Sequence, residues 1–129
     1  MKLYRVILPV GDIDAAEKFY STILGMPGQR ISPGRHYFDL DGTILACYDP
    51  KADDGEIEPV WKPHPKQYVY IATEQLDHVF DIIKTQGATH VDDEIKRMPW
   101  GERMFYANDP WDSPICFVDS KTLFTGHKI

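Results

Sequence analysis

Residues 3–25 read LYRVILPVGDIDAAEKFYSTILG and predict a strand followed directly by a helix. The first part of this stretch is rich in β-forming residues. Asp12 is a suitable N-cap for a helix whose apolar residues, from Ala16 to Leu24, recur with helical spacing. Gly25 supplies the C-terminal stop of that helix.

The same order returns past the midpoint of the chain. Tyr68–Ile71 predicts a strand, Thr73 or Gln75 can cap a helix, and an apolar stripe within 76–83 leads to a stop at Gly87. The two helix starts, Ile13-Asp14 and Leu76-Asp77, are 63 positions apart in the sequence. Shifting one half onto the other by this amount places apolar core positions on apolar core positions.

Each predicted helix is followed by three short β-like pieces separated by turn residues. These pieces are 29–31, 36–40 and 43–48 in the first half, and 91–98, 103–108 and 115–119 in the second. Each half therefore reads β-α-β-β-β, and the fold class is α+β.

The length of 129 residues suits one domain that buries its own core. We expect a single domain, 1–129, made of two modules. The first module covers residues 1–49, a proline-rich linker 50–65, the second module 66–120 and a tail 121–129.

Composition excludes several classes of function. The net charge of -6, without a compensating Lys/Arg run, disfavours nucleic acid as a partner. The apolar segment 3–10 is short and contains Arg5, so it is neither a signal peptide nor a membrane span. A cytoplasmic location is the default expectation. Cys47 and Cys116 lie in separate apolar runs and are expected to be reduced structural thiols.

Two motifs carry a family resemblance. Residues 10–20, VGDIDAAEKFY, closing with ILGM at 23–26, are similar to the opening of the vicinal oxygen chelate superfamily, which includes glyoxalase I, extradiol dioxygenases and bleomycin-resistance proteins. Residues 99–103, PWGER, and 109–115, DPWDSPI, resemble the Trp-Gly turn and the Asp-Pro-x-Gly-Asn hairpin of that family. With these motifs near its two ends, the resemblance covers nearly the whole chain.

The resemblance implies that the two βαβββ modules form a half-open, barrel-like curved sheet around a pocket, with the helices outside. It also implies a homodimer, because many members dimerise. One departure is Asp112-Ser113, which stands where the family has Gly-Asn. Because the turn would lose its usual glycine, we expect this loop to follow a different path.

Metal-dependent members of the family bind a divalent ion through one residue on the first and one on the last strand of each module. At these places the chain has Arg5, Tyr68, Cys116 and either Leu45 or Ala46. Arginine offers no lone pair and would repel a cation beside it, and tyrosine is a rare ligand. We therefore expect no metal and no cofactor at the family's usual site.

The sequence gives only weak indications of a catalytic histidine or cysteine. His36 alone among the histidines is plausible in the cavity, either as a site residue or as a hydrogen-bonded wall residue. Cys116 could be a nucleophile activated by Arg5, although a buried structural thiol is the simpler interpretation. No catalytic residue can be named from the sequence.

Period-two alternation sends Val6 and Leu8 toward the helix and leaves Arg5 and Ile7 on the pocket side. The full set of predicted ligand-binding residues is Arg5, Ile7, Tyr68, Tyr70, Trp100 and Cys116, and Trp61 in the linker could also cover the pocket. An aromatic lining with one fixed positive charge suits a small aromatic or acidic molecule. The main hypothesis is therefore a metal-free, small-molecule-binding protein of the glyoxalase/bleomycin-resistance kind.

Two alternatives stay open. The chain could instead be an enzyme of the glyoxalase/dioxygenase kind, a lyase, isomerase or oxidoreductase, with a rebuilt metal site or with acid–base chemistry through a tyrosine and Arg5. The pocket residues could also be purely structural, with Arg5 paired to an internal carboxylate and the tyrosines filling the barrel.

Overall fold

The structure is a computed structural model of the 129-residue chain, and it describes residues 1–54 and 62–124. The chain divides into two compact units, Met1–Pro63 and His64–Ile129. We refer to these units as the first and the second module.

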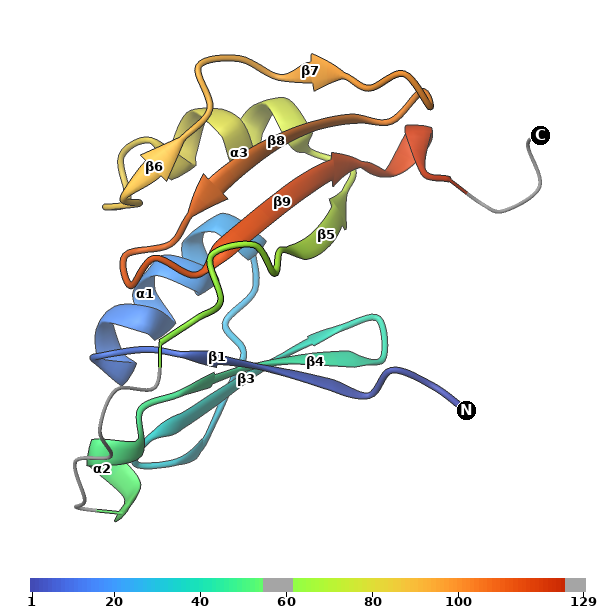
Figure 1. The fold of residues 1–129 in the computed structure, drawn as a ribbon. Helices are drawn as coiled ribbons and strands as arrows, with labels where there is room; N and C mark the ends of the chain where they lie inside the picture. Colours follow the sequence, from blue (N-terminus) through green and yellow to red (C-terminus); the bar gives the residue numbers. More distant parts are fainter. Residues whose placement is uncertain (55–61, 125–129) are drawn as a thin grey trace. The chain divides into compact units, whose positions relative to one another are not determined.

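The first module is an open four-stranded sheet with a long helix packed on β3 and β4 (Figure 1). The strand order is β1-β4-β3-β2, in which β1 and β4 run parallel and the other neighbours antiparallel. The elements are β1 (Arg5–Pro9), α1 (Ile13–Leu24), β2 (Gln29–Ser32), β3 (Arg35–Leu40), β4 (Thr43–Tyr48) and a short α2 (Pro50–Asp54).

Helix α1 begins and ends where the sequence predicts. The Asp12 side chain accepts hydrogen bonds from the backbone N–H groups of Asp14 and Ala15, so two of the free donors at the helix start are satisfied. Gly25 ends the helix in the left-handed region, with φ 70°. The buried face of the helix consists of Ile13, Ala16, Phe19, Tyr20 and Ile23.

The second module repeats this plan with a more irregular sheet (Figure 1). Its strand order is β5-β9-β8-β6, with β7 also paired to β8, and the β5–β9 pair is parallel. The elements are β5 (Val69–Thr73), α3 (Leu76–Ile83), β6 (His90–Val91), β7 (Lys96–Arg97), β8 (Arg103–Asn108), β9 (Pro114–Asp119) and the 3₁₀ turn η1 (Ser120–Thr122).

The predicted strand 91–98 is broken into β6 and β7. Both pieces pair with β8, but the acidic residues between them are poor strand formers. The Asp92 carboxylate itself accepts a hydrogen bond from the backbone N–H of Tyr106. A side chain therefore replaces a backbone partner at the point where the strand is interrupted.

Helix α3 is shorter than predicted. It ends at Ile83, and Gly87, the expected stop, follows four residues later with φ 87°. At the other end the Gln75 side chain makes no capping bond, whereas Thr73 Oγ1 accepts from the Gln75 N–H. Leu76, Val79 and Ile83 are buried as expected.

The β8–β9 hairpin keeps a positive φ without a glycine. Asp112, at the position that the family fills with glycine, has φ 66°. Aspartate is among the few residues that tolerate this region, and its carboxylate also accepts a hydrogen bond from Thr89 Oγ1. The backbone conformation that glycine favours is therefore present here without a glycine, and a different path of the loop stays a prediction.

The cross-strand registers show which residues of the two modules are equivalent. Ile7 lies opposite Ala46 in the first module, and Tyr70, 63 positions after Ile7, lies opposite Cys116 in the second. Ala46 in turn pairs with Tyr37, and Cys116 pairs with Tyr106. The two sheets can therefore be compared residue by residue.

The α+β class and the repeated module are confirmed, and both sheets are open. The start of the expected linker forms α2, whose Asp53 accepts hydrogen bonds from Ser32 Oγ and the backbone N–H of Gly34. In the expected tail, Thr122 Oγ1 accepts from the Arg103 N–H. No helix in the described ranges is long and apolar enough to cross a membrane.

Candidate functional site

Each sheet has one face against its own helix, and we call the opposite face the helix-free face. In the first module Arg30 and His36 point to α1, because Arg30 binds Asp14 and Glu17 of that helix. Their strand neighbours Gln29 and Tyr37 therefore point the other way.

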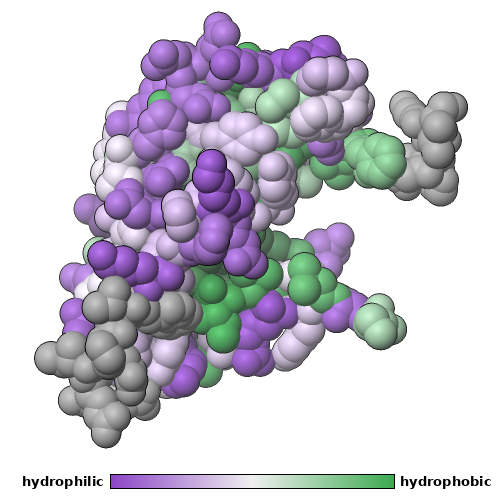
Figure 2. Space-filling view, in the orientation of Figure 1, coloured by the Kyte–Doolittle hydropathy of each residue, from purple (hydrophilic) through white to green (hydrophobic). Residues whose placement is uncertain are grey.

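Two rows of cross-strand partners form the helix-free face of the first module. One row joins Arg5, Ile44 and Asp39 across β1, β4 and β3. The next row joins Ile7, Ala46, Tyr37 and Gln29. Ile7 is half-exposed, and Figure 2 shows apolar side chains gathered over this sheet.

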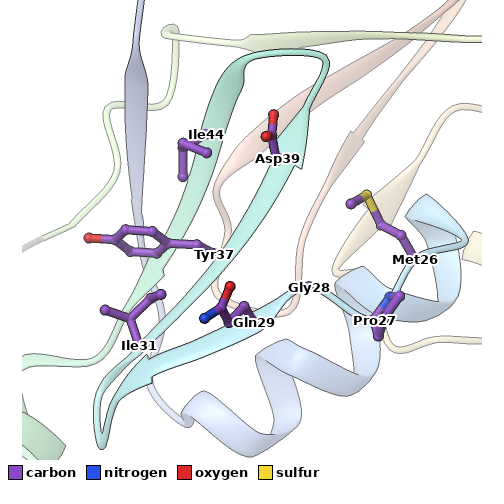
Figure 3. A pocket seen from close by; sticks show the side chains of 8 residues that line it. All are labelled: Met26, Pro27, Gly28, Gln29, Ile31, Tyr37, Asp39 and Ile44. Carbon is purple, nitrogen blue, oxygen red and sulfur yellow. The ribbon is translucent and has the colours of Figure 1, made fainter.

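A cavity of about 360 Å³ opens on this face (Figure 3). The sheet contributes Gln29, Ile31, Tyr37, Asp39 and Ile44 to its lining. The rest of the wall is the α1–β2 loop, Met26 to Gly28. Apolar side chains thus surround a small number of polar groups, which is the usual composition of a small-molecule site.

Arg5 is not itself a lining residue of this cavity but stacks on one of them, Tyr37. Its guanidinium carbon is 5.1 Å from the ring centroid of Tyr37, which lines the cavity, and 5.0 Å from that of Tyr4. Such stacking holds the planar cation while leaving its N–H donors available. Arg5 is exposed and forms no ion pair with any carboxylate in the described residues.

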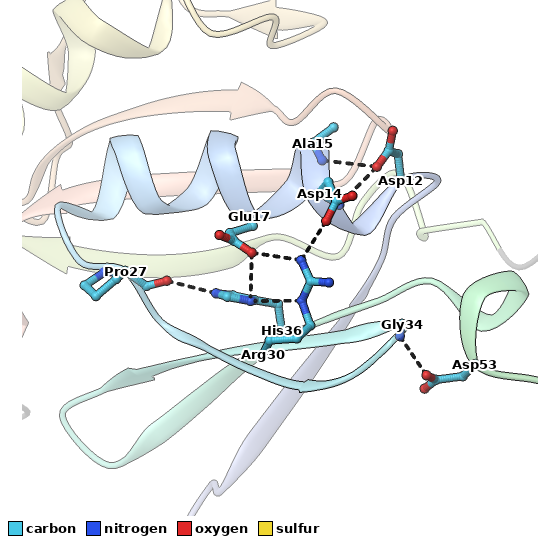
Figure 4. A network of polar contacts seen from close by, with 9 residues as sticks. All are labelled: Asp12, Asp14, Ala15, Glu17, Pro27, Arg30, Gly34, His36 and Asp53. Atoms are coloured by element: carbon cyan, nitrogen blue, oxygen red, sulfur yellow. Dashed lines mark hydrogen bonds and ion pairs between the residues drawn. The ribbon is translucent and has the colours of Figure 1, made fainter.

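The loop wall is held from behind by His36 (Figure 4). His36 is only 3% exposed, and its Nε2 lies 2.9 Å from the carbonyl oxygen of Pro27. A carbonyl can only accept, so Nε2 carries the proton and donates. His36 is thus a hydrogen-bonded residue behind the cavity, on the helix side of the sheet.

Gly28 makes the close approach of this loop possible. It has φ 64°, and a Cβ at this position would lie 2.7 Å from His36 Nε2 and from a ring carbon of Phe38. Both the backbone conformation and the space therefore require glycine.

A charged network continues from His36 to α1. Arg30 Nε is 3.4 Å from His36 Nδ1, and its Nη2 donates to Asp14 at 2.9 Å and to Glu17 at 2.8 Å. The hydrogen bond to Asp14, opposed in part by desolvation, raises the pKa of Arg30. The network fixes β2 against α1 and so supports the cavity wall from the helix side of the sheet.

The helix-free face of the second module is aromatic. The rings of Tyr68, Tyr70 and Tyr106 form a triangle in which the Tyr106 centroid is 4.9 Å from that of Tyr68 and 6.3 Å from that of Tyr70, and the hydroxyls of Tyr70 and Tyr106 are 3.3 Å apart. This hydrogen bond, together with burial, raises the pKa of Tyr106. The Tyr106 hydroxyl therefore stays protonated at neutral pH.

Cys116 lies on the same face but is fully covered. It packs with Met104 and Val118 under Met98 and Tyr106, and its Sγ is 3.6 Å from Met104 Sδ. Burial raises the pKa of the thiol to about 12. A nucleophilic thiolate needs a lowered pKa, so the structure favours the simpler interpretation of Cys116 as a structural thiol.

The remaining predicted residues lie apart from these clusters. Trp100 is exposed in the β7–β8 turn, where its Nε1 donates to Glu102. Trp61 lies outside the described residues. The structure thus groups Arg5 and Ile7 on one sheet, and Tyr68, Tyr70 and Cys116 on the other.

Four positions of this chain correspond to the metal ligands of metal-dependent members of the family. The registers identify Ala46, and not Leu45, as the counterpart of Cys116, so the four places hold Arg5, Ala46, Tyr68 and Cys116. A cationic guanidinium, a methyl group and a protonated buried thiol do not suit a divalent ion. Within residues 1–54 and 62–124 no group of three His, Cys, Asp or Glu side chains could hold a metal ion.

Sequence reasoning missed Tyr37, Asp39 and Tyr106. Alternation assigns the faces within one strand, but only the register between strands shows which side chains are neighbours. Superposing the inner strands of the repeat, in addition to the first strands, would have paired Tyr37 with Tyr106 and drawn attention to both.

The chain matches the model of the Glyoxalase/Bleomycin resistance protein/Dioxygenase superfamily over residues 2–117. Because this match spans most of the 129 residues, the chain belongs to that superfamily. A search of curated proteins finds no match.

Solved structures show the same fold over nearly the whole chain. A glyoxalase/bleomycin resistance protein from Albidiferax ferrireducens T118 is 20% identical, with a TM-score of 0.75 and coverage of 90% of this chain and 97% of that one. A glyoxalase-related enzyme from Fulvimarina pelagi is 15% identical, with a TM-score of 0.75 and coverage of 94% and 89%. A lactoylglutathione lyase from Agrobacterium tumefaciens is 19% identical, with a TM-score of 0.67 and coverage of 93% and 94%.

Proposed function

We propose that this protein binds a small aromatic or acidic molecule without a metal ion, and that Arg5 pairs with the acidic group. The proposal rests on the position and the exposure of Arg5. At the place of a metal ligand in metal-dependent relatives, the chain has an exposed guanidinium that rests on the wall of a cavity. A cation there attracts an anion and repels a metal.

The surroundings of Arg5 support an aromatic ligand body. Tyr37 and Ile44 give the cavity a flat aromatic surface and an apolar floor, and its volume of about 360 Å³ is in the range of small-molecule sites. Ile7, in the neighbouring row, extends this apolar surface. That Tyr68, Tyr70 and Trp100 contact the ligand stays a prediction, and Cys116 is covered by Met98 and Tyr106.

The alternative of acid–base catalysis by a tyrosine has less support. A general base near neutral pH needs a tyrosine whose pKa is lowered, whereas the pKa of Tyr106 is raised by its bond to Tyr70. The protonated Tyr106 hydroxyl suits hydrogen-bond donation rather than proton abstraction. Binding without turnover is therefore the function that we propose.

Calorimetric titration with aromatic carboxylates tests this proposal. Benzoate, 4-hydroxybenzoate and indole-3-acetate should bind, and neutral benzamide should bind more weakly. Arg5→Ala should lower the affinity for the carboxylates by about fivefold or more, because a charge-assisted pair is lost at a partly exposed site. Lys18→Ala, which removes the same charge from the exposed side of α1, is the matched control and should change little.

Unchanged affinity in Arg5→Ala would remove Arg5 from the site. Titration with Ni²⁺, Zn²⁺ and Mn²⁺ tests the metal-free part, because stoichiometric metal binding that competes with the carboxylates would overturn it. The homodimer and the cytoplasmic location are part of the same proposal, and light scattering of the purified protein tests the dimer.

A further inference from the structure

Charges of both signs are present on the face that bears the cavity: Asp39 lines the cavity, and Arg5 stacks on the lining residue Tyr37. Arg5 and Asp39 occupy the two ends of one cross-strand row, and Ile44 lies between them. Neighbouring strands are about 4.8 Å apart, so the two charged residues are attached to the sheet about 10 Å from each other. An apolar surface therefore separates a cation from a carboxylate.

Asp39 is only partly used by the protein. Its Oδ1 accepts a hydrogen bond from the backbone N–H of Gly42 at 2.7 Å, in the turn between β3 and β4. That bond engages one oxygen, and within the described residues Asp39 forms no ion pair. Figure 3 shows the carboxylate among the side chains that line the cavity.

We propose that the ligand is amphoteric, with its anionic group at Arg5, an ammonium or other strong donor at Asp39, and a flat apolar body across Ile44 and Tyr37. This inference rests on the proposed function, in which Arg5 holds the acidic group. A ligand with the two groups at opposite ends of a ring fits the row better than one with both groups on a single carbon, because Arg5 and Asp39 flank the floor from opposite sides.

Three ligands that differ by one group each provide the test. 4-(Aminomethyl)benzoate carries both groups, 4-methylbenzoate lacks the ammonium, and 4-methylbenzylamine lacks the carboxylate. The wild-type protein should bind 4-(aminomethyl)benzoate about fivefold more tightly than 4-methylbenzoate, which is the contribution expected of one partly exposed ion pair. 4-Methylbenzylamine should bind least well, because it places no anion at Arg5.

Asp39→Asn should remove this difference between the two carboxylates. The asparagine oxygen can still accept from Gly42, so the turn is kept while the charge is lost. Asp41→Asn is the matched control, since Asp41 lies in the same turn with φ 56°, a conformation that asparagine tolerates. That variant should retain the fivefold preference. Methyl NMR shifts of Ile31 and Ile44 should report all of these binding events.

The outcomes separate this inference from the proposed function. Equal binding of the two carboxylates by the wild type, or a preference that survives in Asp39→Asn, would overturn the amphoteric ligand. The proposed function would stand in that case if 4-methylbenzoate binds and Arg5→Ala weakens it. If neither carboxylate binds, the proposed function fails and the inference fails with it.

Discussion

The two modules share a backbone plan but present different helix-free faces. Where the first module has Ile7 and Ala46, the second has Tyr70 and Cys116 at the equivalent register positions. The small Ala46 and the neighbouring Ile44 leave room for a cavity beside Tyr37. In the second module Cys116 packs with Met104 and Val118 under Met98 and Tyr106, while Tyr70 stays exposed.

The helix sides differ in a related way. His36 in the first module and Phe105 in the second are equivalent, because they pair with Cys47 and Phe117. Phe105 is a core residue packed between Phe80 and Phe117, whereas His36 donates to the Pro27 carbonyl of the cavity wall. The same position of the repeat is therefore a core packing residue in the second module, Phe105, and a residue that supports the cavity wall in the first, His36.

The largest effect is expected from Phe105→Ala. Phe105 is fully buried, with ring centroids of Phe80 and Phe117 at 5.0 Å and 5.5 Å. Removing the ring should lower the free energy of unfolding by about 3–5 kcal/mol, which urea denaturation followed by circular dichroism will measure. Phe105→Leu should cost much less. A loss below about 1 kcal/mol in the alanine variant would show that the position is not part of the packed core.

His36→Ala should have a smaller effect on stability and a specific effect on the cavity. The loss of the ring and of its bond to Pro27 should cost about 2 kcal/mol of unfolding free energy. The affinity for 4-methylbenzoate should also fall, because the Met26–Gly28 wall loses its support. His36→Gln keeps a donor near the Nε2 position and should restore part of the affinity. Equal affinity in the wild type and the alanine variant would separate His36 from the site.

The smallest effect is expected from the helix-anchoring ion pairs, in which Asp14 and Asp77 are equivalent. The hydrogen bond from Arg103 lowers the pKa of Asp77. The stabilisation from this carboxylate is therefore complete at pH values above its unfolded pKa and is lost as the pH falls through the lower folded value. The small difference in urea midpoint between Asp77→Asn and the wild type near pH 7 should shrink progressively as the pH falls below the unfolded aspartate pKa of about 3.9.

Asp14→Asn sharpens this last comparison. Arg30 retains Glu17 at 2.8 Å when Asp14 is neutralised, whereas Arg103 retains only Asp119 at 3.5 Å when Asp77 is neutralised. The Asp14 variant should therefore change the urea midpoint less than the Asp77 variant. A larger change at Asp14 would show that the first module depends more on its anchor than its geometry indicates.

The sequence was sufficient for the class, the repeat and the starts of α1 and α3, because these depend on local signals. The Asp12 cap and the Gly25 stop lie directly next to the helix that they delimit. The division of strand 91–98 was not predictable from alternation, since it depends on Asp92 bonding to another strand. Periodicity also placed Cys116 on the correct face, but it could not show that Met98 and Tyr106 cover it.

The site was predicted less completely for the same reason. Arg5 and Ile7 follow from alternation within β1, and the structure leaves both exposed. The cavity beside them depends on the Met26–Gly28 loop, whose position is set by His36 across the sheet. Such contacts join residues that are distant along the chain, so neither composition nor spacing reveals them.

The bond between His36 and Pro27 makes the imidazole a natural spectroscopic probe. One ring nitrogen bonds to the cavity wall and the other faces Arg30 and Glu17. A ligand that displaces the wall should therefore change the ¹⁵N signals of a side chain that it never touches. Occupancy of the cavity can thus be followed from the opposite side of the sheet, without a label on the ligand or a substitution in the cavity.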